Sequence, residues 1–466
     1  MDLNNFFVPA PKIRPQLNVG CLMDIPTGRY VLGKHGESIL NGGLAYVEGV
    51  GGRGNMGKST FMHFRKLRAL ARYARSMLGY YDTETSMTFA RLNSLARHLK
   101  QLLGIDLEDS GRVSITDNTV MSGNEWFAKL KQLAEEKKKQ NKDWLYTTPF
   151  LDEKTGNLIQ AFYPTLFGLD SLSMFLTDSV EGIYEKNQIG DSGANTDSLR
   201  GAAAKSQMLM QLPTTTGQAG LYVTMTMHVG DQHQLDPYAP QKKQLAFLKG
   251  GVSFKHVPQK ITFLTNNLWY VYNSTVLANK GTKAPEYPKD PSDNMEGDTD
   301  LQLMQLQNLR AKTGPTGMPF ELVWSQSEGI LVGLSEFNYI KSFDRYGISG
   351  NDRTYFLDLL PDVSLSRTTI RGKIDENEML QRALEITSEM CQMKYLWDDV
   401  DGLFCTPKEL YEDLKAKGYD WSRLLQTRGY WVFEEDKEGL PPFLSTMDLL
   451  RMRKGLYHPY WYGDLK

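Results

Sequence analysis

The chain has 466 residues, 41% of them hydrophobic and 23% charged, and its 53 basic and 55 acidic residues give a net charge of −2. This composition is typical of a globular protein with a large core, and it excludes binding to nucleic acid through bulk charge alone. We expect a cytoplasmic protein, because the apolar runs are shorter than the ~20 residues of a membrane span, no signal peptide begins the chain and three cysteines show no disulfide or metal spacing.

The first part of the chain alternates between strand and helix patterns. Residues 1–27 are rich in proline and asparagine, and we expect an N-terminal arm there. The alternation that follows predicts a strand over 44–50, a helix over 58–77, a strand over 78–82 and a helix over 88–103. Strands that alternate with helices form βαβ units, so we predict an α/β fold with a mostly parallel sheet flanked by helices.

The middle of the chain continues this core as far as residue 345, with insertions near 125–163 and 278–299. We predict a charged helix over 125–142 and a hairpin over 144–164, and then strands over 165–170 and 220–228 separated by a helix that ends near 212. Further strands, an exposed loop over 278–299 and a closing hairpin follow. From 346 to 466 the pattern becomes helical, with aromatic-rich turns and a capping box from Thr406 to Glu409, which indicates a smaller, mainly helical C-terminal domain.

A glycine-rich stretch, YVEGVGGRGNMGKSTFMHF over 46–64, contains Gly52-x4-Gly57-Lys58-Ser59. Glycines let backbone N–H groups approach a phosphate closely, and the positive end of a following helix adds to the attraction. The side chain of Lys58 can reach the β- and γ-phosphates, and the hydroxyl of Ser59 can bind Mg²⁺. A chance glycine-rich turn is the alternative, but the strand before and the long helix after favour nucleotide binding.

Polar residues end three apolar strands and would meet at one edge of a parallel sheet. Asp82 and Glu84 follow the strand over 78–82, and Glu84 is our candidate for orienting the water that attacks the γ-phosphate. Helix capping, the alternative for this cluster, suits Thr85 or Ser86 better. Asp170 is placed to hold Mg²⁺, and His228 to contact the γ-phosphate, although an isolated histidine is often structural.

The order of these motifs resembles that of RecA-type ATPases, and most of all the UvsX recombinases of phages. The likeness runs from about residue 25 to 342 through the segments IPTGRYVLGKHGESILNGG, YYDTET, LFGLDSLS, QIGDS, MHVGD, FLKGGVSFKH, LQNLRAKTGPTG and EGILVGLSEF. It implies a RecA-like core that binds ATP and Mg²⁺. The last ~120 residues have no clear counterpart in the family.

The resemblance implies a role for each matching residue of the nucleotide site. The phosphate loop would consist of Gly52, Arg53, Gly54, Asn55, Met56, Gly57, Lys58, Ser59 and Thr60. Ser59 and Asp170 would hold Mg²⁺, and Glu84 would activate water. His228 would sense the γ-phosphate at the end of the sheet, where cellular RecA proteins have glutamine. Arg91 occupies the place of the aromatic residue that stacks on adenine, and a guanidinium can also stack.

Two loops would contact single-stranded DNA. The first would contribute Lys186, Gln188, Ile189 and Arg200, and the second, over about 229–256, Lys242, Lys243, Phe247, Lys249, Gly250, Gly251 and Lys255. Lysines, an aromatic ring and glycines in one short stretch suit phosphate neutralisation and base stacking on a mobile backbone. A solvated surface loop is the alternative reading of the second segment.

Contacts between subunits form the last group of expectations. Arg310 and Lys312 stand where RecA-type and DnaB-type ATPases reach the neighbouring subunit's ATP, so the resemblance implies an oligomer with a basic pair acting in trans. FVPA, Phe7–Ala10, matches the F-x-x-A pattern with which recombinases dock onto the next subunit, although an arm packed on its own domain is equally consistent. The segment GPTG after Lys312 is closer to DnaB-type helicases.

Together these features favour a DNA-dependent ATPase that forms filaments on single-stranded DNA and promotes homologous pairing and strand exchange. Phage single-strand-binding and mediator proteins are the partners that the resemblance implies, with no membrane partner, and the host-cell cytoplasm is the expected location for a phage protein. Two alternatives remain open from the sequence. One is a hexameric DnaB-like helicase, and the other is a RecA-fold protein kept as a non-catalytic DNA-binding or assembly module.

Overall fold

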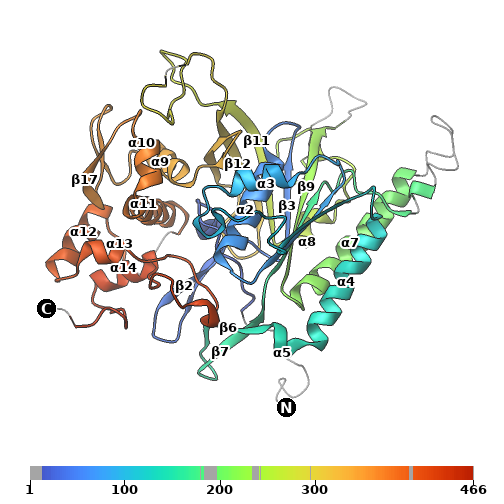
Figure 1. Cartoon of the computed structure of the whole chain (residues 1–466), viewed down its shortest axis with the longest axis horizontal. Helices are drawn as coiled ribbons and strands as arrows, with labels where there is room; N and C mark the ends of the chain where they lie inside the picture. The colour runs from blue at the N-terminus through green and yellow to red at the C-terminus, as the bar shows by residue number, and fades with distance from the viewer. Residues whose placement is uncertain are drawn as a thin grey trace.

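The computed structural model describes residues 13–178, 180–182, 197–232, 241, 243–293, 295–397 and 402–464. A ten-stranded sheet forms its centre (Figure 1). Six of its strands are parallel and lie in the order β5 (Val113–Asp117), β4 (Met77–Asp82), β8 (Thr165–Asp170), β9 (Leu221–Asp231), β3 (Val47–Gly52) and β11 (Asn267–Val276). The predicted fold class, α/β with a mostly parallel sheet flanked by helices, is confirmed.

Antiparallel strands extend this sheet beyond β11. They are β12 (Leu301–Ala311), β13 (Pro319–Ser325) and β14 (Gly329–Ile330), and the last two form the predicted closing hairpin. A further short strand, β10 (Val252–Phe254), pairs antiparallel with the end of β9. The predicted loop over 278–299 connects β11 to β12, and Tyr287 fixes it by packing its buried ring edge-on against Phe337.

Helices cover both faces of the sheet because side chains on a strand alternate between the two faces. Tyr80 belongs to the apolar cluster beneath α2 (Lys58–Arg72) and α3 (Phe89–Ala96), whereas the adjacent Tyr81 packs against Trp126 and Phe175 on the opposite face. That opposite face is covered by α4 (Gly123–Lys139), α7 (Asp197–Gly217) and α8 (Ile261–Leu264). In Figure 1, α4 and α7 lie along the right of the molecule.

A buried ion pair fixes α2 against β3. Arg65 and Glu48 are completely buried, with Nη1 2.6 Å from Oε2, and Asn267 donates to the same carboxylate at 2.7 Å.

The helix α2 is shorter than the predicted 58–77, because it ends at Arg72 and β4 already begins at Met77. The predicted helix over 88–103 likewise stops at Ala96 and is followed by the 3-10 turn η2 (Lys100–Leu102).

The hairpin predicted over 144–164 is confirmed. It consists of β6 (Leu145–Asp152) and β7 (Asn157–Phe162) and follows the short helix α5 (Asn141–Trp144). A second hairpin near the start of the described chain pairs β1 (Arg29–Leu32) with β2 (Ser38–Asn41).

The N-terminal segment differs from the expected arm over 1–27 in its described part, because residues 13–27 are packed into the protein. Leu17 pairs with Leu44, the Asn18 N–H donates to the hydroxyl of Tyr73, and the short helix α1 (Asp24–Thr27) is buried. These contacts tie the segment to the core, so the chain does not extend away from it there. Phe7–Ala10 lies outside the described residues.

The C-terminal part packs on the same apolar cluster as α2, at the left of Figure 1. Its helices are α9 (Val332–Ser342), α10 (Ile370–Glu376), α11 (Glu378–Leu396), α12 (Pro407–Ala416), α13 (Trp421–Leu425), the 3-10 turn η4 (Glu434–Asp436) and α14 (Thr446–Arg453). The capping box from Thr406 to Glu409 is confirmed. The prediction missed a small sheet of β15 (Ile348–Gly350), β16 (Tyr355–Leu357) and β17 (Leu360–Leu365). None of the helices in the described ranges is long and apolar enough to cross a bilayer.

Candidate functional site

The glycine-rich loop joins the end of β3 to the start of α2, so its backbone lies at the carboxyl edge of the parallel strands. Gly57 caps the helix with φ 80°, and a Cβ there would lie 2.5 Å from Cε of Met304. A Cβ at Gly52 would lie 2.9 Å from the carbonyl oxygen of Val271. Both positions therefore require glycine. The first N–H groups of α2 have no partner within the helix and are available to a phosphate.

Lys58 is the first residue of α2, and its side chain reaches back to this loop. Its Nζ donates to the carbonyl oxygen of Arg53 at 2.8 Å, and the residue is only 7% exposed. Burial lowers the pKa of Lys58, while the negative charges of Asp170 and Glu84 act in the opposite direction. The three predicted residues, which come from three different segments, thus lie within electrostatic reach of one another.

Asp82 shapes the turn that presents Glu84. Its buried carboxylate accepts hydrogen bonds from the backbone N–H groups of Glu84, Ser86 and Met87 at 2.9, 2.6 and 2.7 Å. The alternative for this cluster, that Thr85 or Ser86 caps the next helix, is wrong, because α3 is capped by the hydroxyl of Thr88. Asp82 is thereby committed to the backbone, and Glu84 keeps a carboxylate that is 41% exposed.

Asp170 lies at the end of β8, beside β4. Its carboxylate accepts a hydrogen bond from the hydroxyl of Thr226 on β9, and its backbone carbonyl accepts the N–H of Thr83 at 2.6 Å. The Thr83 hydroxyl in turn accepts the N–H of Ser171 at 2.7 Å. Sequence reasoning gave no role to Thr83, which lies in the segment YYDTET directly after β4, or to Thr226, a strand residue of β9 that no motif marks. They hold Asp170 and the Glu84 turn in a fixed relation.

Glu84 and His228 meet across this edge of the sheet. Nε2 of His228 lies 3.1 Å from Oε1 of Glu84, and the Ser171 hydroxyl donates to the same oxygen at 3.3 Å. The expectation that His228 ends the sheet is wrong, because β9 runs on to Asp231. The antiparallel partner β10, which supplies hydrogen bonds beyond the parallel region, is the reason.

The residues present fit a nucleotide with Mg²⁺. Among the described residues, no group of three or more His, Cys, Asp or Glu side chains is arranged around a possible metal position. Mg²⁺ commonly binds through one or two protein groups together with substrate phosphates and water, and Ser59 and Asp170 could provide such groups. Arg91, expected near the base, donates from its guanidinium to the carbonyl of Gln326 at 2.6 Å, and burial lowers its pKa.

The second predicted DNA loop begins and ends in the ribbon of β9 and β10. Phe254 of β10 lies against the phosphate-loop strand, since a Cβ at Gly51 would come within 2.3 Å of its ring. Arg53 of the phosphate loop forms an ion pair with Asp231 at 2.5 Å, and the Lys255 ammonium donates to the Asp231 carbonyl. This ribbon therefore joins the phosphate loop directly to the second loop.

Several predicted DNA-binding residues are solvent-accessible. Lys243 and Lys249 are exposed, and Phe247 is 45% exposed although its ring covers Gly317. Gly250 and the positive-φ Gly251 lie beside Gln241. Arg200 is exposed on α7. Lys242, Lys186, Gln188 and Ile189 lie outside the described residues.

Lys205, which sequence reasoning missed, connects α7 to the second loop. Its buried ammonium donates to the carbonyl oxygens of Ser173 and His256 at 3.0 and 3.1 Å, and burial lowers its pKa to about 8. The Ser173 hydroxyl accepts the N–H of His228 at 2.9 Å and donates to the carbonyl of Lys255 at 2.9 Å. A lone lysine in a helix gives no signal for such a role.

Arg310 and Lys312 lie at the opposite edge of the sheet from the phosphate loop. Asn267 pairs with Glu48 and Ala311, whereas Gly52 pairs with Val271 at the other end of the same strands. Four strand residues correspond to roughly 13 Å, and Arg310 is further held by donating to the carbonyl of Thr265 at 3.1 Å. Within one chain the basic pair cannot reach the site beside Lys58.

Comparison with known proteins adds little to this geometry. No protein-family model and no curated protein matches the chain. The solved structures that match include one described as the crystal structure of the RadB recombinase, which is similar over 62% of this chain and 92% of that chain, with 15% identical residues and a TM-score of 0.33. A likeness of this strength carries no argument about function, and the fold class rests on the strand order of the central sheet.

Proposed function

We propose that the protein is an ATP-dependent recombinase of the RecA type, similar to phage UvsX, which forms filaments on single-stranded DNA and promotes homologous pairing. The observation that carries the proposal is the contact between Glu84 and His228 beside Lys58. It joins a candidate water-orienting carboxylate to the strand that leads into the second DNA loop. A glycine-rich turn without a nucleotide would have no need of this arrangement.

Each residue of the site has its own role in the proposed hydrolysis of ATP. Bound ATP and Mg²⁺ supply the phosphoanhydride bond and the charge that polarises it. The loop N–H groups and Lys58 would hold the phosphates, and Ser59 and Asp170 would hold the metal. Glu84 orients and deprotonates the attacking water, and Arg91 borders the base. Ser171 keeps the Glu84 carboxylate in place by donating to Oε1.

His228 and the ribbon of β9 and β10 form the link from nucleotide to DNA in this proposal. A γ-phosphate that attracts Arg53 and His228 competes with Asp231 and Glu84, the partners of these residues in the structure. Loss of the Arg53–Asp231 pair would release Asp231, and loss of the Glu84–His228 contact would release His228. Both residues lie on β9, so the position of the second loop would depend on the nucleotide. Such differential contacts are what allow a ligand to shift a conformational equilibrium.

The proposal requires an oligomer, since Arg310 and Lys312 can only serve the ATP of a neighbouring subunit. Single-stranded DNA would lie on the loops that carry Lys243, Lys249 and Phe247. Phage single-strand-binding and mediator proteins are proposed partners.

A ring helicase has less support, because packing within the chain explains the GPTG segment that favoured it. A Cβ at Gly314 would lie 1.9 Å from the carbonyl oxygen of Pro26, so this glycine serves packing within the chain.

Electron microscopy tests the proposal directly. The full chain is imaged with single-stranded DNA and a non-hydrolysable ATP analogue, beside the Lys58→Ala variant and a sample without nucleotide. We expect nucleotide-dependent filaments that Lys58→Ala does not form. Closed six-membered rings would favour the helicase instead. An ATPase assay with and without DNA that shows no turnover would favour a non-catalytic assembly protein.

A further inference from the structure

Lys205 lies where the two candidate DNA loops return to the core. It belongs to α7, which begins at Asp197 and carries the exposed Arg200 of the first loop. The second loop returns through β10, and His256 follows that strand by two residues. The Lys205 ammonium donates to the carbonyl oxygen of His256 at 3.1 Å and to that of Ser173 at 3.0 Å. One buried ammonium therefore joins α7 and the end of the second loop to the turn that follows β8.

Ser173 continues this connection to the nucleotide site. Its hydroxyl accepts the N–H of His228 at 2.9 Å and donates to the carbonyl of Lys255 at 2.9 Å. Nε2 of His228 in turn lies 3.1 Å from Oε1 of Glu84. The contacts therefore run without a break from Lys205 to Glu84, the candidate water-orienting carboxylate.

The ammonium of Lys205 is held by backbone dipoles. The residue is 6% exposed, burial lowers its pKa to about 8, and no carboxylate of the described residues forms an ion pair with it. A buried charge without a counter-charge is costly, so an apolar side chain of the same length would serve the core better. The lysine is therefore better explained by the segments that it holds together than by packing.

Lys137 is a counterpart with the same chemistry in a different position. It is completely buried on α4, and its ammonium donates to the carbonyl of Tyr163 at 2.6 Å and to the hydroxyl of Thr165 at 3.1 Å. Thr165 begins β8, whereas the candidate nucleotide site lies at the other end of that strand. The described contacts of Lys137 therefore fix α4 to the sheet away from the nucleotide site.

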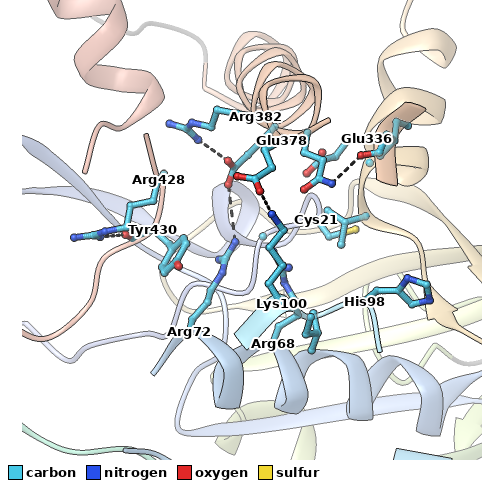
Figure 2. Close-up of a pocket in the computed structure, with 18 of the residues that line it drawn as sticks. Cys21, Arg68, Arg72, His98, Lys100, Glu336, Glu378, Arg382, Arg428 and Tyr430 are labelled. Carbon is cyan, nitrogen blue, oxygen red and sulfur yellow. Dashed lines mark hydrogen bonds and ion pairs between the residues drawn. The ribbon is translucent and has the colours of Figure 1, made fainter. Parts of the chain in front are cut away.

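The largest cavity of the protein, about 570 Å³, provides no comparable route. It lies beside α11 and the end of α2 (Figure 2), and none of the described residues assigned to the DNA loops lines it. Guanidinium nitrogens of Arg72 lie 3.8 Å from a carboxylate oxygen of Asp24 and 4.0 Å from one of Glu385. Arg382 lies 2.5 Å from the same Glu385 carboxylate. These pairs join α2 to α11 and so hold the C-terminal part against the core.

We propose that Lys205 is a positioning residue that couples the binding of single-stranded DNA to ATP hydrolysis. The inference rests on the function proposed above, and it adds a route by which the first DNA loop acts on the nucleotide site. DNA bound at Arg200 would fix the position of α7, and Lys205 would pass that position to the turn at Ser173. The N–H of His228 is held by Ser173, so the contact between His228 and Glu84 would depend on DNA. Such coupling requires linked elements with two arrangements that differ in their contacts.

The test compares Lys205→Met with Lys137→Met in the full chain. At both positions methionine keeps the approximate length of the side chain and removes the ammonium. Phosphate release is measured at saturating ATP, without DNA and with a saturating single-stranded oligonucleotide, and melting temperatures show whether each variant is folded. We expect the ratio of the two rates to fall at least about fivefold in Lys205→Met. Lys137→Met should keep the wild-type ratio even if it melts at a lower temperature, because a structural change lowers both rates together.

Ser173→Ala tests the same route without altering Lys205. It removes the hydroxyl that accepts the N–H of His228 and keeps the carbonyl that accepts from Lys205, so it should lower the ratio as well. The double variant should lose little more than the more affected single variant, because the two changes interrupt one route. Losses that multiply in the double variant would overturn the inference. If Lys205→Met does not fold, an unchanged ratio in Ser173→Ala would overturn it.

The wild-type chain separates this inference from the function on which it rests. If DNA does not stimulate the ATPase of the wild-type protein, both the recombinase function and the role of Lys205 are overturned. If DNA stimulates wild type and Lys205→Met equally, the proposed function stands and the role of Lys205 alone is overturned.

Discussion

Nε2 of His228 lies 3.1 Å from Oε1 of Glu84, although 144 residues separate them in the chain. The contact forms because β4 and β9 are separated in the sheet only by β8. Asp82 fixes the turn at the end of β4, and Ser173 fixes the backbone of His228 by accepting its N–H at 2.9 Å. The carboxylate is thus held at a set place beside Lys58, as a water-orienting group requires.

Glu84→Gln should retain ATP binding and lose hydrolysis. The amide preserves the size of the side chain but is no base, so we expect DNA-stimulated turnover to fall by about 10²–10⁴-fold. Turnover is measured by phosphate release and ATP binding by a fluorescent analogue. Ser171→Ala is the control, because it removes the 3.3 Å hydrogen bond to Glu84 and keeps the carboxylate; it should cost less than about tenfold. Unchanged turnover in Glu84→Gln would exclude this residue.

Asp231→Asn should strengthen ATP binding. The wild-type carboxylate holds Arg53 at 2.5 Å on the surface, where the pair stabilises the fold by less than about 1 kcal/mol. Its removal frees Arg53 for the triphosphate and removes a negative charge near it, so we expect affinity to rise about threefold to tenfold. Asp352→Asn removes an even more exposed partner of Arg345 elsewhere and should leave affinity unchanged. Weaker binding in Asp231→Asn would contradict the role given to Arg53.

Local sequence signals placed the glycine-rich loop and the ends of β4 and β8, because each depends on a short segment whose neighbours are regular. Signals that depend on distant contacts were missed. Residues 13–27 are buried partly by Trp431, whose indole donates to the carbonyl of Gln16. The three residues of β10 lie in a polar stretch and form a strand only because β9 offers a free edge. Lys205 and Thr226 act through tertiary contacts alone.

Arg310 should act on the ATP site of the neighbouring subunit. Arg310→Ala and Lys58→Ala proteins should each be inactive, yet a mixture should recover activity, because some interfaces combine an intact Lys58 with an intact Arg310. When the two variants are mixed randomly in equal amounts, about one quarter of all interfaces have both residues intact. Phosphate release in the presence of DNA measures the recovery. Mixing Lys58→Ala with the Lys58→Ala, Arg310→Ala double variant provides the blank. Full activity of Arg310→Ala alone would refute the assignment.

Glu48→Ala should strongly destabilise the fold. It leaves Arg65 completely buried without its counter-charge and also removes the acceptor for Asn267. We expect the free energy of unfolding to fall by about 3–5 kcal/mol, measured by urea denaturation. The matched control is Glu135→Ala, which breaks the 2.6 Å pair with the accessible Lys138 and should cost less than about 1 kcal/mol. Equal losses in the two variants would contradict a structural role for the buried pair.

Lys137 should make the stability of the protein depend on pH in the alkaline range. Its ammonium is buried and donates to the carbonyl of Tyr163 at 2.6 Å and to the hydroxyl of Thr165 at 3.1 Å. Burial lowers the pKa of Lys137 from 10.5 to about 7. Between these values the unfolded chain binds more protons than the folded one, so this group makes the free energy of unfolding rise with pH.

Lys137→Met removes that contribution. The slope of unfolding free energy against pH should decrease by up to ~1.4 kcal/mol per pH unit between about pH 7 and 10. The contribution of Lys137 makes the free energy of unfolding of wild type fall as pH falls towards 7, and the variant lacks this contribution. The difference in unfolding free energy between variant and wild type should therefore be most favourable to the variant near pH 7. Urea denaturation at several pH values measures both slopes. Lys139→Met, an exposed position on the same helix, should keep the wild-type slope. A Lys137→Met slope equal to that of wild type would mean that the buried amine keeps its proton throughout this range.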